Sequence, residues 1–281
     1  MSSSKNTFIA FLLNLCFSII EFIFGALFNS SAILADAVHD FGDALAIGSS
    51  ALMQTFANKP ADITYPLGYK RWNILAALLT SSILIIGSSL ILVENIPNLF
   101  HPQPVNQDGM LVLGVIAIII NFAASRIVKN GHSHNESILS LHFLEDILGW
   151  LAVILVSIIL QFTDWYFLDP LLSIIISLFI LSQALPKAWN NLKIFLEQTP
   201  SGIKSDELAL ELLSIPNVES IVQLKVWTMD GYEHCATMTV KLTNHALAGK
   251  TKERIRNSLI TYGILQITIF PICYGNFYII N

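Results

Sequence analysis

The sequence predicts an α-helical membrane protein in which six transmembrane helices precede a small cytoplasmic α+β domain of ferredoxin-like αββαβ order. Hydrophobic residues occupy 54% of the 281 positions and charged residues only 12%, whereas soluble domains carry about 25% charged residues. The apolar residues are concentrated between residue 7 and about residue 186, and the remainder has a soluble pattern. We therefore expect a transmembrane domain at 1–198 and a cytoplasmic domain at 199–281.

Six segments are apolar over a length sufficient to span a bilayer, which takes about 20 helical residues. They are 7–28, 32–56, 72–93, 110–127, 138–162 and 170–185. The first carries small or polar residues at spacings of four, three and four: Asn14, Ser18, Glu21 and Gly25. Such spacing places them on one helical face. No small-residue cleavage site follows the N-terminus, so we expect a retained first helix.

Basic residues lie on one side of this six-helix arrangement. They are Lys5, Lys59, Lys70, Arg71, Arg126, Lys129, Lys187 and Lys193. The loops on the opposite side, near 29–31, 94–109 and 163–169, contain no Lys or Arg. The positive-inside rule then predicts that both termini are cytoplasmic.

The C-terminal part alternates between helical and strand patterns. Its expected elements are a helix at 206–213, strands at 218–228 and 234–242, a helix at 250–262 and a strand at 264–272. Asp230-Gly231 is a hairpin signal between the first two strands. Pro271 confines the last strand to a sheet edge or ends it. The order is most of a split βαβ unit, and a sheet this small usually needs a partner surface.

Two apolar stretches carry ionisable side chains. Residues 30–50 contain Asp36, His39, Asp40 and Asp43, which share one helical face, and residues 140–156 contain His142, Glu145 and Asp146. An ionisable group at membrane depth costs several kcal/mol, so such groups mark a functional site by default.

Each stretch contains one His-x-x-x-Asp pair, which places two ligands on one helical face. Together His39, Asp43, His142 and Asp146 could supply two nitrogen and two oxygen ligands to one ion, which suits tetrahedral Zn²⁺. Imidazole argues against Mg²⁺ and Ca²⁺, and the absence of thiolate argues against Cu⁺. The cysteines (Cys16, Cys235 and Cys273) are far apart, so we expect no disulfide framework.

Metal and protons compete for such a site, because its ligands must be deprotonated to bind metal and histidine titrates near neutrality. We therefore predict an antiporter that exchanges Zn²⁺ for H⁺, with the metal as transported substrate and no cofactor. Co²⁺, Cd²⁺, Fe²⁺ and Mn²⁺ remain alternative substrates, because selectivity depends on geometry.

Two other function classes compete with a transporter: an intramembrane metalloprotease and a membrane metal sensor or scaffold. An intramembrane metalloprotease needs H-E-x-x-H, which the chain lacks, and four protein ligands leave no open position for a catalytic water. A membrane metal sensor or scaffold would place the activity in the soluble domain. We predict that the chain is not an enzyme and has no nucleic-acid partner.

Several motifs resemble those of the cation diffusion facilitator family, of the zinc-transporter type. They are LADAVHDFGDAL, YPLGYKRWNILAALLTS, SLHFLEDILGW and LDPLLSIIISLFIL. The resemblance implies a homodimeric, proton-coupled exporter of divalent cations, mostly Zn²⁺. The lack of long His-rich tracts and extensions leads us to expect a compact form in the plasma (inner) membrane. The resemblance also maps the family's transport ligands onto His39, Asp43, His142 and Asp146, a pattern that the family links to zinc preference.

The soluble domain departs from the family pattern. Lys225 stands in LKVW where the family tends to have histidine, ATMTVKL has threonine in place of histidine, and GILQITIFP has no histidine. A lysine ammonium would repel a cation. We therefore expect this domain to dimerise by packing, without a bound metal.

The remaining polar candidates have weaker patterns. Asp40 and Glu145 could support the ligands, Asp36 could line the entry path, and Glu21 could pair with a neighbouring helix. We expect His132 and His134 to lie in a solvated loop. Three consecutive residues, Glu233, His234 and Cys235, fit an ordinary strand start, and His101 fits an exposed loop.

Overall fold

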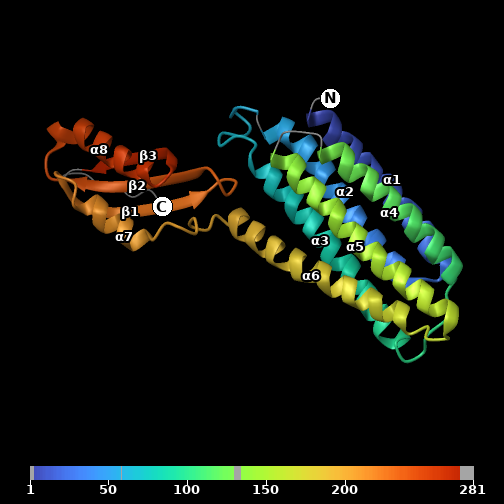
Figure 1. Cartoon of the computed structure of the whole chain (residues 1–281). Coiled ribbons are helices and arrows are strands. Elements are labelled where there is room, and N and C mark those ends of the chain that lie inside the picture. The colour runs from blue at the N-terminus through green and yellow to red at the C-terminus, as the bar shows by residue number, and fades with distance from the viewer. Residues whose placement is uncertain (1–2, 58, 130–133, 273–281) are drawn as a thin grey trace. The chain divides into compact units, whose positions relative to one another are not determined.

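The structure is a computed structural model that describes residues 3–57, 59–129 and 134–272 (Figure 1). It consists of two compact units, residues 1–189 and 190–281. The boundary lies within the sixth helix, whereas the sequence analysis places it after residue 198. Each unit is described by itself below.

Six long helices form the first unit (Figure 1). They are α1 (Ser3–Phe28), α2 (Ser31–Ala57), α3 (Arg71–Asn98), α4 (Gln107–Lys129), α5 (His134–Phe162) and α6 (Leu168–Phe195). The most extensive helix pairs are α4 with α5, α1 with α2 and α2 with α3. All six coincide with segments that the sequence predicts as helices.

Three of these helices have the length and hydropathy of a membrane span within the described residues: Phe11–Phe28 of α1, Arg71–Asn98 and Leu168–Phe195. In α4 and α5 the described apolar stretches are shorter, at Gln107–Ala123 and Asp146–Phe162. The helix α2 has a less apolar composition because three aspartates occupy its first half. The helical unit is thus membrane-like, and the count of six spans rests on the sequence.

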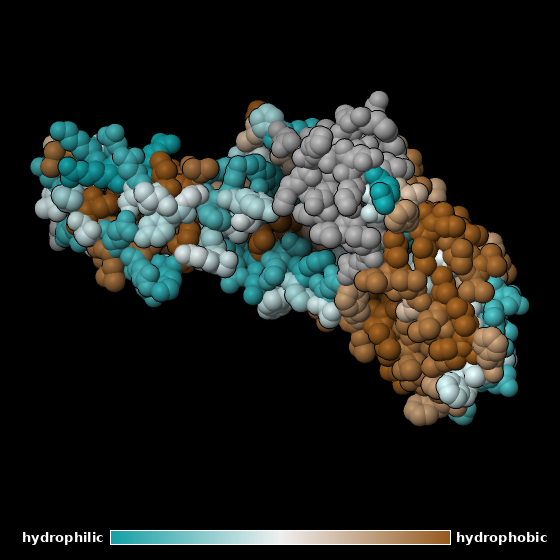
Figure 2. Space-filling model, viewed as in Figure 1, coloured by the Kyte–Doolittle hydropathy of each residue, from teal (hydrophilic) through white to brown (hydrophobic). Residues whose placement is uncertain are grey.

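The helical unit buries many polar side chains and exposes many apolar ones. Polar residues buried within it include Asn14, Ser18, Glu21, Ser81, Ser88, Asn121, Ser173 and Ser177. Exposed residues include Ile23, Leu27, Leu79, Leu90, Ile119 and Leu155, and Figure 2 shows a broad hydrophobic face over these helices. This distribution suits a hydrocarbon surrounding, where backbone groups bond within their own helix and side chains facing lipid are apolar. It also confirms the single polar face predicted for α1.

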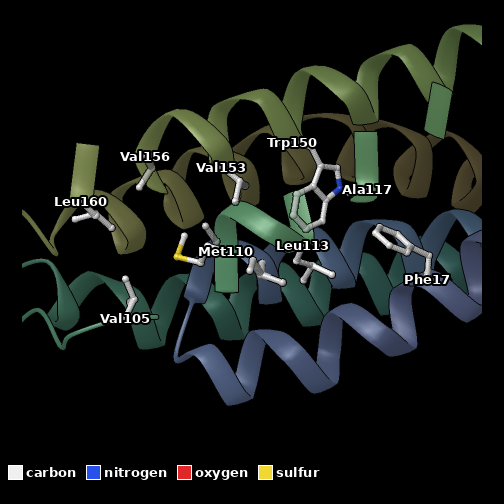
Figure 3. Close-up of a cluster of buried hydrophobic side chains, with 11 residues drawn as sticks. Phe17, Val105, Met110, Leu113, Ala117, Trp150, Val153, Val156 and Leu160 are labelled. Atoms are coloured by element: carbon white, nitrogen blue, oxygen red, sulfur yellow. The ribbon is translucent and has the colours of Figure 1, made fainter. Parts of the chain in front are cut away.

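Large apolar side chains fill the space between α1, α4 and α5 (Figure 3). Trp150 is fully buried beside Leu113 and Ala117 of α4. Its ring meets Phe17 of α1 edge-on, with centroids 5.9 Å apart, a favoured aromatic geometry. A Cβ at Gly114 would lie 2.7 Å from Ile154, so a glycine there lets α4 and α5 approach closely.

The helices α2 and α3 also approach closely through glycines. A Cβ at Gly42 would overlap the Leu84 side chain, and a Cβ at Gly87 would lie 2.8 Å from Val38. Gly42 directly precedes Asp43 in the chain. The backbone that carries this aspartate is therefore held against α3.

The second unit is a three-stranded sheet with two helices. Its elements are α7 (Ser205–Leu213), β1 (Val218–Thr228), β2 (His234–Leu242), a short 3₁₀ helix (His245–Leu247), α8 (Ala248–Thr261) and β3 (Ile264–Ile272). The sheet order is β1-β2-β3, with β1 antiparallel and β3 parallel to β2. This confirms the predicted αββαβ order, and Pro271 lies on an edge strand as expected.

Alternate residues of the strands face the helices. A single cluster joins the sheet to α7 and α8: Leu208, Leu212, Val226, Ala236, Met238, Val240, Leu242, Ile255, Leu259 and Ile264. Lys225 is exposed and pairs with Thr237 across β1 and β2. Because side chains alternate along a strand, Lys225 lies on the opposite face of the sheet from Val226.

A carboxylate joins the two helices of this unit. Glu211 of α7 accepts hydrogen bonds from the Ser258 hydroxyl and the Tyr262 hydroxyl at the end of α8, both at 2.5 Å. The bond from Ser258, and then that from Tyr262, lowers the pKa of Glu211. The same contact raises the pKa of Tyr262.

We predict that Glu211→Gln destabilises the full chain more at pH 7 than at pH 3. Because the folded pKa lies below the unfolded value, this stabilisation is present above the unfolded pKa and is lost as pH falls through the folded pKa. The effect is at most about 1 kcal/mol, since the pair is exposed. Thermal unfolding in detergent at both pH values measures it, with the exposed Glu253→Gln as control. Equal destabilisation at the two pH values would contradict this role.

Candidate metal centre

Ionisable side chains from α2 and α5 meet inside the helical unit. Nε2 of His39 lies 3.4 Å from Oδ2 of Asp43 and 3.9 Å from Oδ1 of Asp146. His39 and Asp43 are one helical turn apart on α2, so a helix presents both in the same direction. Asp146 reaches them from α5, more than 100 positions later in the sequence.

The spacing of these atoms is close to that of ligands around a small cation. Zinc–nitrogen and zinc–oxygen bonds of about 2.0–2.2 Å put tetrahedral ligand atoms about 3.3–3.5 Å apart. The two separations from His39 Nε2, 3.4 and 3.9 Å, are near that value and longer than ordinary hydrogen bonds. One nitrogen and two carboxylate oxygens therefore lie at separations compatible with ligands of one small cation.

The three side chains differ in burial. The Asp146 side chain is 1% exposed, while those of His39 and Asp43 are 17% and 24% exposed. The group is thus open on the α2 side and closed around Asp146. An ion entering from that side would meet His39 and Asp43 first.

The fourth predicted ligand lies on the same helix as Asp146. His142 precedes Asp146 by four residues in α5, and this spacing places both on one face. The side chains of His142 and Glu145 lie outside the described side chains. The structure therefore brings together three of the four predicted ligands, and the place of His142 follows from its position in the helix.

A second group of carboxylates lies in the same bundle. Glu21 of α1 and Asp36 and Asp40 of α2 have carboxylate oxygens within 4.8 Å of one another. All three residues are buried, at 0%, 4% and 2% exposure. Three buried carboxylates repel one another unless protons or a cation neutralise them.

The sequence predicts a separate role for each of these three residues and does not predict that they lie together. It assigns Asp36 to an entry path, Asp40 to supporting the ligands and Glu21 to pairing with a neighbouring helix. The polar face of α1 is the sequence feature from which this grouping could have been predicted. Because α1 and α2 pack along much of their length, the polar face of one helix meets that of the other.

The expectations for the other histidines and cysteines fare differently, and His134 corrects one of them because it belongs to a helix and not to a loop. His101 is exposed, as expected; His132 lies outside the described residues, and His134 begins α5. In β2 the Cys235 thiol donates to Oε1 of Gln266 at 3.5 Å. Cys16 is a free thiol, and Cys273 lies outside the described residues.

Comparison with known proteins identifies the family. Residues 7–196 match the model of the cation efflux transmembrane domain. The chain is a member of the cation diffusion facilitator family. Because this is a family of transporters, the chain is not an enzyme, and the resemblance of its four sequence motifs is confirmed.

Curated relatives cover most of the chain. It is 32% identical to the zinc transporter ZitB of Pectobacterium atrosepticum, over 80% of this chain and 72% of the relative. It is 30% identical to the metal cation efflux system protein CzcD of Cupriavidus metallidurans, over 84% and 75%. It is 27% identical to the cadmium, cobalt and zinc/H(+)-K(+) antiporter of Bacillus subtilis, over 95% and 88%.

We predict that His39→Ala and His142→Ala each lower zinc affinity by more than about 100-fold, since even an indirect contact to a metal ligand contributes 10- to 100-fold. Isothermal titration of the purified protein in detergent measures the affinity.

The matched control is Glu21→Gln, which changes the neighbouring carboxylate group but leaves all four predicted ligands in place. We expect it to keep zinc affinity within about tenfold, the lower end of the range for an indirect contact. If Glu21→Gln abolishes binding and the histidine variants retain it, the ion binds at the carboxylate group instead.

Proposed function

We propose that this cation diffusion facilitator is a proton-coupled antiporter that exports divalent cations, most strongly Zn²⁺, from the cytoplasm. The observation that carries this proposal is the convergence of His39, Asp43 and Asp146 from two helices of an apolar unit. In the family's transport reaction the cation is the substrate. An intramembrane ligand group is what such a reaction requires.

The chemistry of the ligands favours zinc. Imidazole nitrogen and carboxylate oxygen suit a borderline cation, and four such ligands complete a tetrahedron. We assign the fourth position to His142. Relatives named as transporters of zinc, and of cadmium, cobalt and zinc, support this substrate class. Co²⁺, Cd²⁺, Fe²⁺ and Mn²⁺ are the alternative substrates.

Proton coupling follows from the same three side chains. When His39 is neutral, its nitrogen and the two carboxylates form a cation site. When a proton occupies His39, imidazolium can form ion pairs with Asp43 and Asp146, and one of the two negative charges on the site is balanced without metal. The Bacillus subtilis relative is named an antiporter that involves H⁺ and K⁺, which supports exchange.

The proposed setting is a multi-pass protein of the plasma (inner) membrane, with six spans and both termini in the cytoplasm. The Lys and Arg residues on one side of the six-helix arrangement support this orientation. A transport domain at 1–198 would then precede a cytoplasmic domain at 199–281. We also propose a homodimer, since the small sheet leaves the face that carries Lys225 without covering helices in the described unit.

We predict that purified protein in liposomes moves zinc in response to a pH gradient and that Asp146→Asn abolishes this flux. The substitution keeps the side-chain size but removes a ligand charge. A zinc-sensitive dye inside the vesicles measures the initial rate. The matched control is Asp108→Asn. This changes an exposed carboxylate of α4 that accepts a hydrogen bond from the Gln161 side chain at 3.4 Å.

Zinc flux that ignores the pH gradient would contradict coupling, and unchanged flux in Asp146→Asn would contradict the assigned site. Flux measured with Co²⁺, Cd²⁺, Fe²⁺ and Mn²⁺ in the same vesicles decides among the alternative substrates.

A further inference from the structure

A buried carboxylate joins the ends at which α2 and α6 begin. Asp169, the second residue of α6, is 1% exposed. Its Oδ1 accepts hydrogen bonds from the Ser30 hydroxyl at 2.6 Å and from the Ala32 amide at 3.4 Å. Its Oδ2 accepts from the Ser31 amide at 2.7 Å. We call this group of hydrogen bonds the Asp169 clamp.

The clamp provides hydrogen-bond acceptors for the backbone amides in the first turn of α2. The opening amides of a helix have no partner within the helix, and here Asp169 accepts from two of them. The Ser30 oxygen accepts from the next, the amide of Ile33, at 3.3 Å. The negative charge also lies at the positive end of the α2 dipole. The burial of Asp169 is therefore offset by one hydroxyl and two amides that belong to another helix.

Apart from the clamp, α6 contacts the bundle through side chains, with Leu168 and Leu172 against the hydrophobic cluster. Of the six long helices, α6 has the least close backbone contact with the others over the described residues. Its buried face consists largely of small side chains, including Ser173, Ser177 and Ala184. A flat face of this kind allows one helix to slide or tilt against another. The clamp thus gives α6 three hydrogen bonds to the start of α2.

The same helix, α2, carries two predicted ligands. His39 follows Ser31 by eight residues, which is about 12 Å along a helix. A displacement at the clamped end of α2 would therefore move His39 and Asp43 relative to Asp146 on α5. The clamp thus holds the start of the helix that carries two of the four predicted ligands.

We propose that Asp169 is a positioning residue and that its clamp is a pivot, which stays closed while α2 tilts to change access to the metal centre. This inference rests on the proposed transport function. It concerns the transport cycle and not the predicted metal ligands. Changing the clamp is therefore expected to alter zinc flux but not zinc affinity.

The first test substitutes each side of the clamp. In Asp169→Asn an amide NH₂ replaces one acceptor oxygen, and in Ser30→Ala the hydroxyl donor is lost. We expect the maximal zinc flux in proteoliposomes to fall about tenfold, as the loss of one hydrogen bond to a charged group predicts. Equilibrium zinc affinity in detergent should stay within about twofold, because no ligand is changed.

Two control variants accompany this test. Ser30→Thr keeps the hydroxyl and should restore flux to the level of the unmodified protein. Asp164→Asn changes an exposed carboxylate near the same end of α6, which accepts only from Tyr166 at 3.3 Å among its recorded bonds, and should leave flux unchanged. If Asp169→Asn lowers zinc affinity and thermal stability in proportion to flux, Asp169 is only structural and the inference is wrong.

The second test replaces the clamp by a covalent link. The double variant Ser30→Cys/Asp169→Cys, with Cys16, Cys235 and Cys273 changed to alanine, is treated with a short reducible thiol cross-linker. A pivot that stays closed predicts that cross-linked protein transports zinc and that reduction lowers the flux. Loss of flux on cross-linking, with zinc binding retained, would show that the two ends must separate, which would overturn the pivot.

The unmodified protein is assayed in the same vesicles. If it moves no zinc under a pH gradient, the proposed function itself fails. If it transports and the clamp variants transport equally well, the proposed function stands and the pivot is wrong.

Discussion

The structure depends on one constraint, which is that a carboxylate buried in an apolar helical unit must be neutralised or fully hydrogen-bonded. The helices meet this constraint in three ways. Asp169 accepts three hydrogen bonds from the start of α2. Asp43 and Asp146 face the imidazole of His39. The remaining group, around Glu21, consists of carboxylates alone, so its charge must be balanced by protons or by an ion.

All three arrangements include α2, which makes this helix the organising element of the transport unit. Its first turn binds Asp169, its next turns contribute Asp36 and Asp40, and the same region presents His39 and Asp43. Glycine contacts hold α2 against α3, and α1 packs along it. A change of charge at the proposed metal centre would therefore act on the helix that we propose tilts to change access to it.

The sequence predicts local features well and long-range pairings only in part. The period of α1 places Glu21 on the buried face, and Pro271 marks an edge strand, because both follow from geometry within one element. His39, Asp43 and Asp146 lie near one another, and the His-x-x-x-Asp spacing accounts for the shared direction of the two residues on α2. Their role as metal ligands stays a prediction. The bond between Ser30 and Asp169 joins residues 139 positions apart, and no local periodicity encodes it. The grouping of Glu21 with two aspartates is likewise set by how α1 and α2 rotate against each other.

X-ray absorption spectroscopy of the zinc-loaded protein tests the central claim most directly, because it reports the atoms bound to the metal. The account predicts about two imidazole nitrogens and two carboxylate oxygens at roughly 2.0–2.2 Å, with no sulfur. A shell of oxygen atoms alone would place the ion at the Glu21, Asp36 and Asp40 group instead. Sulfur at about 2.3 Å would contradict the assignment as well, because it would place zinc on a cysteine outside the proposed centre.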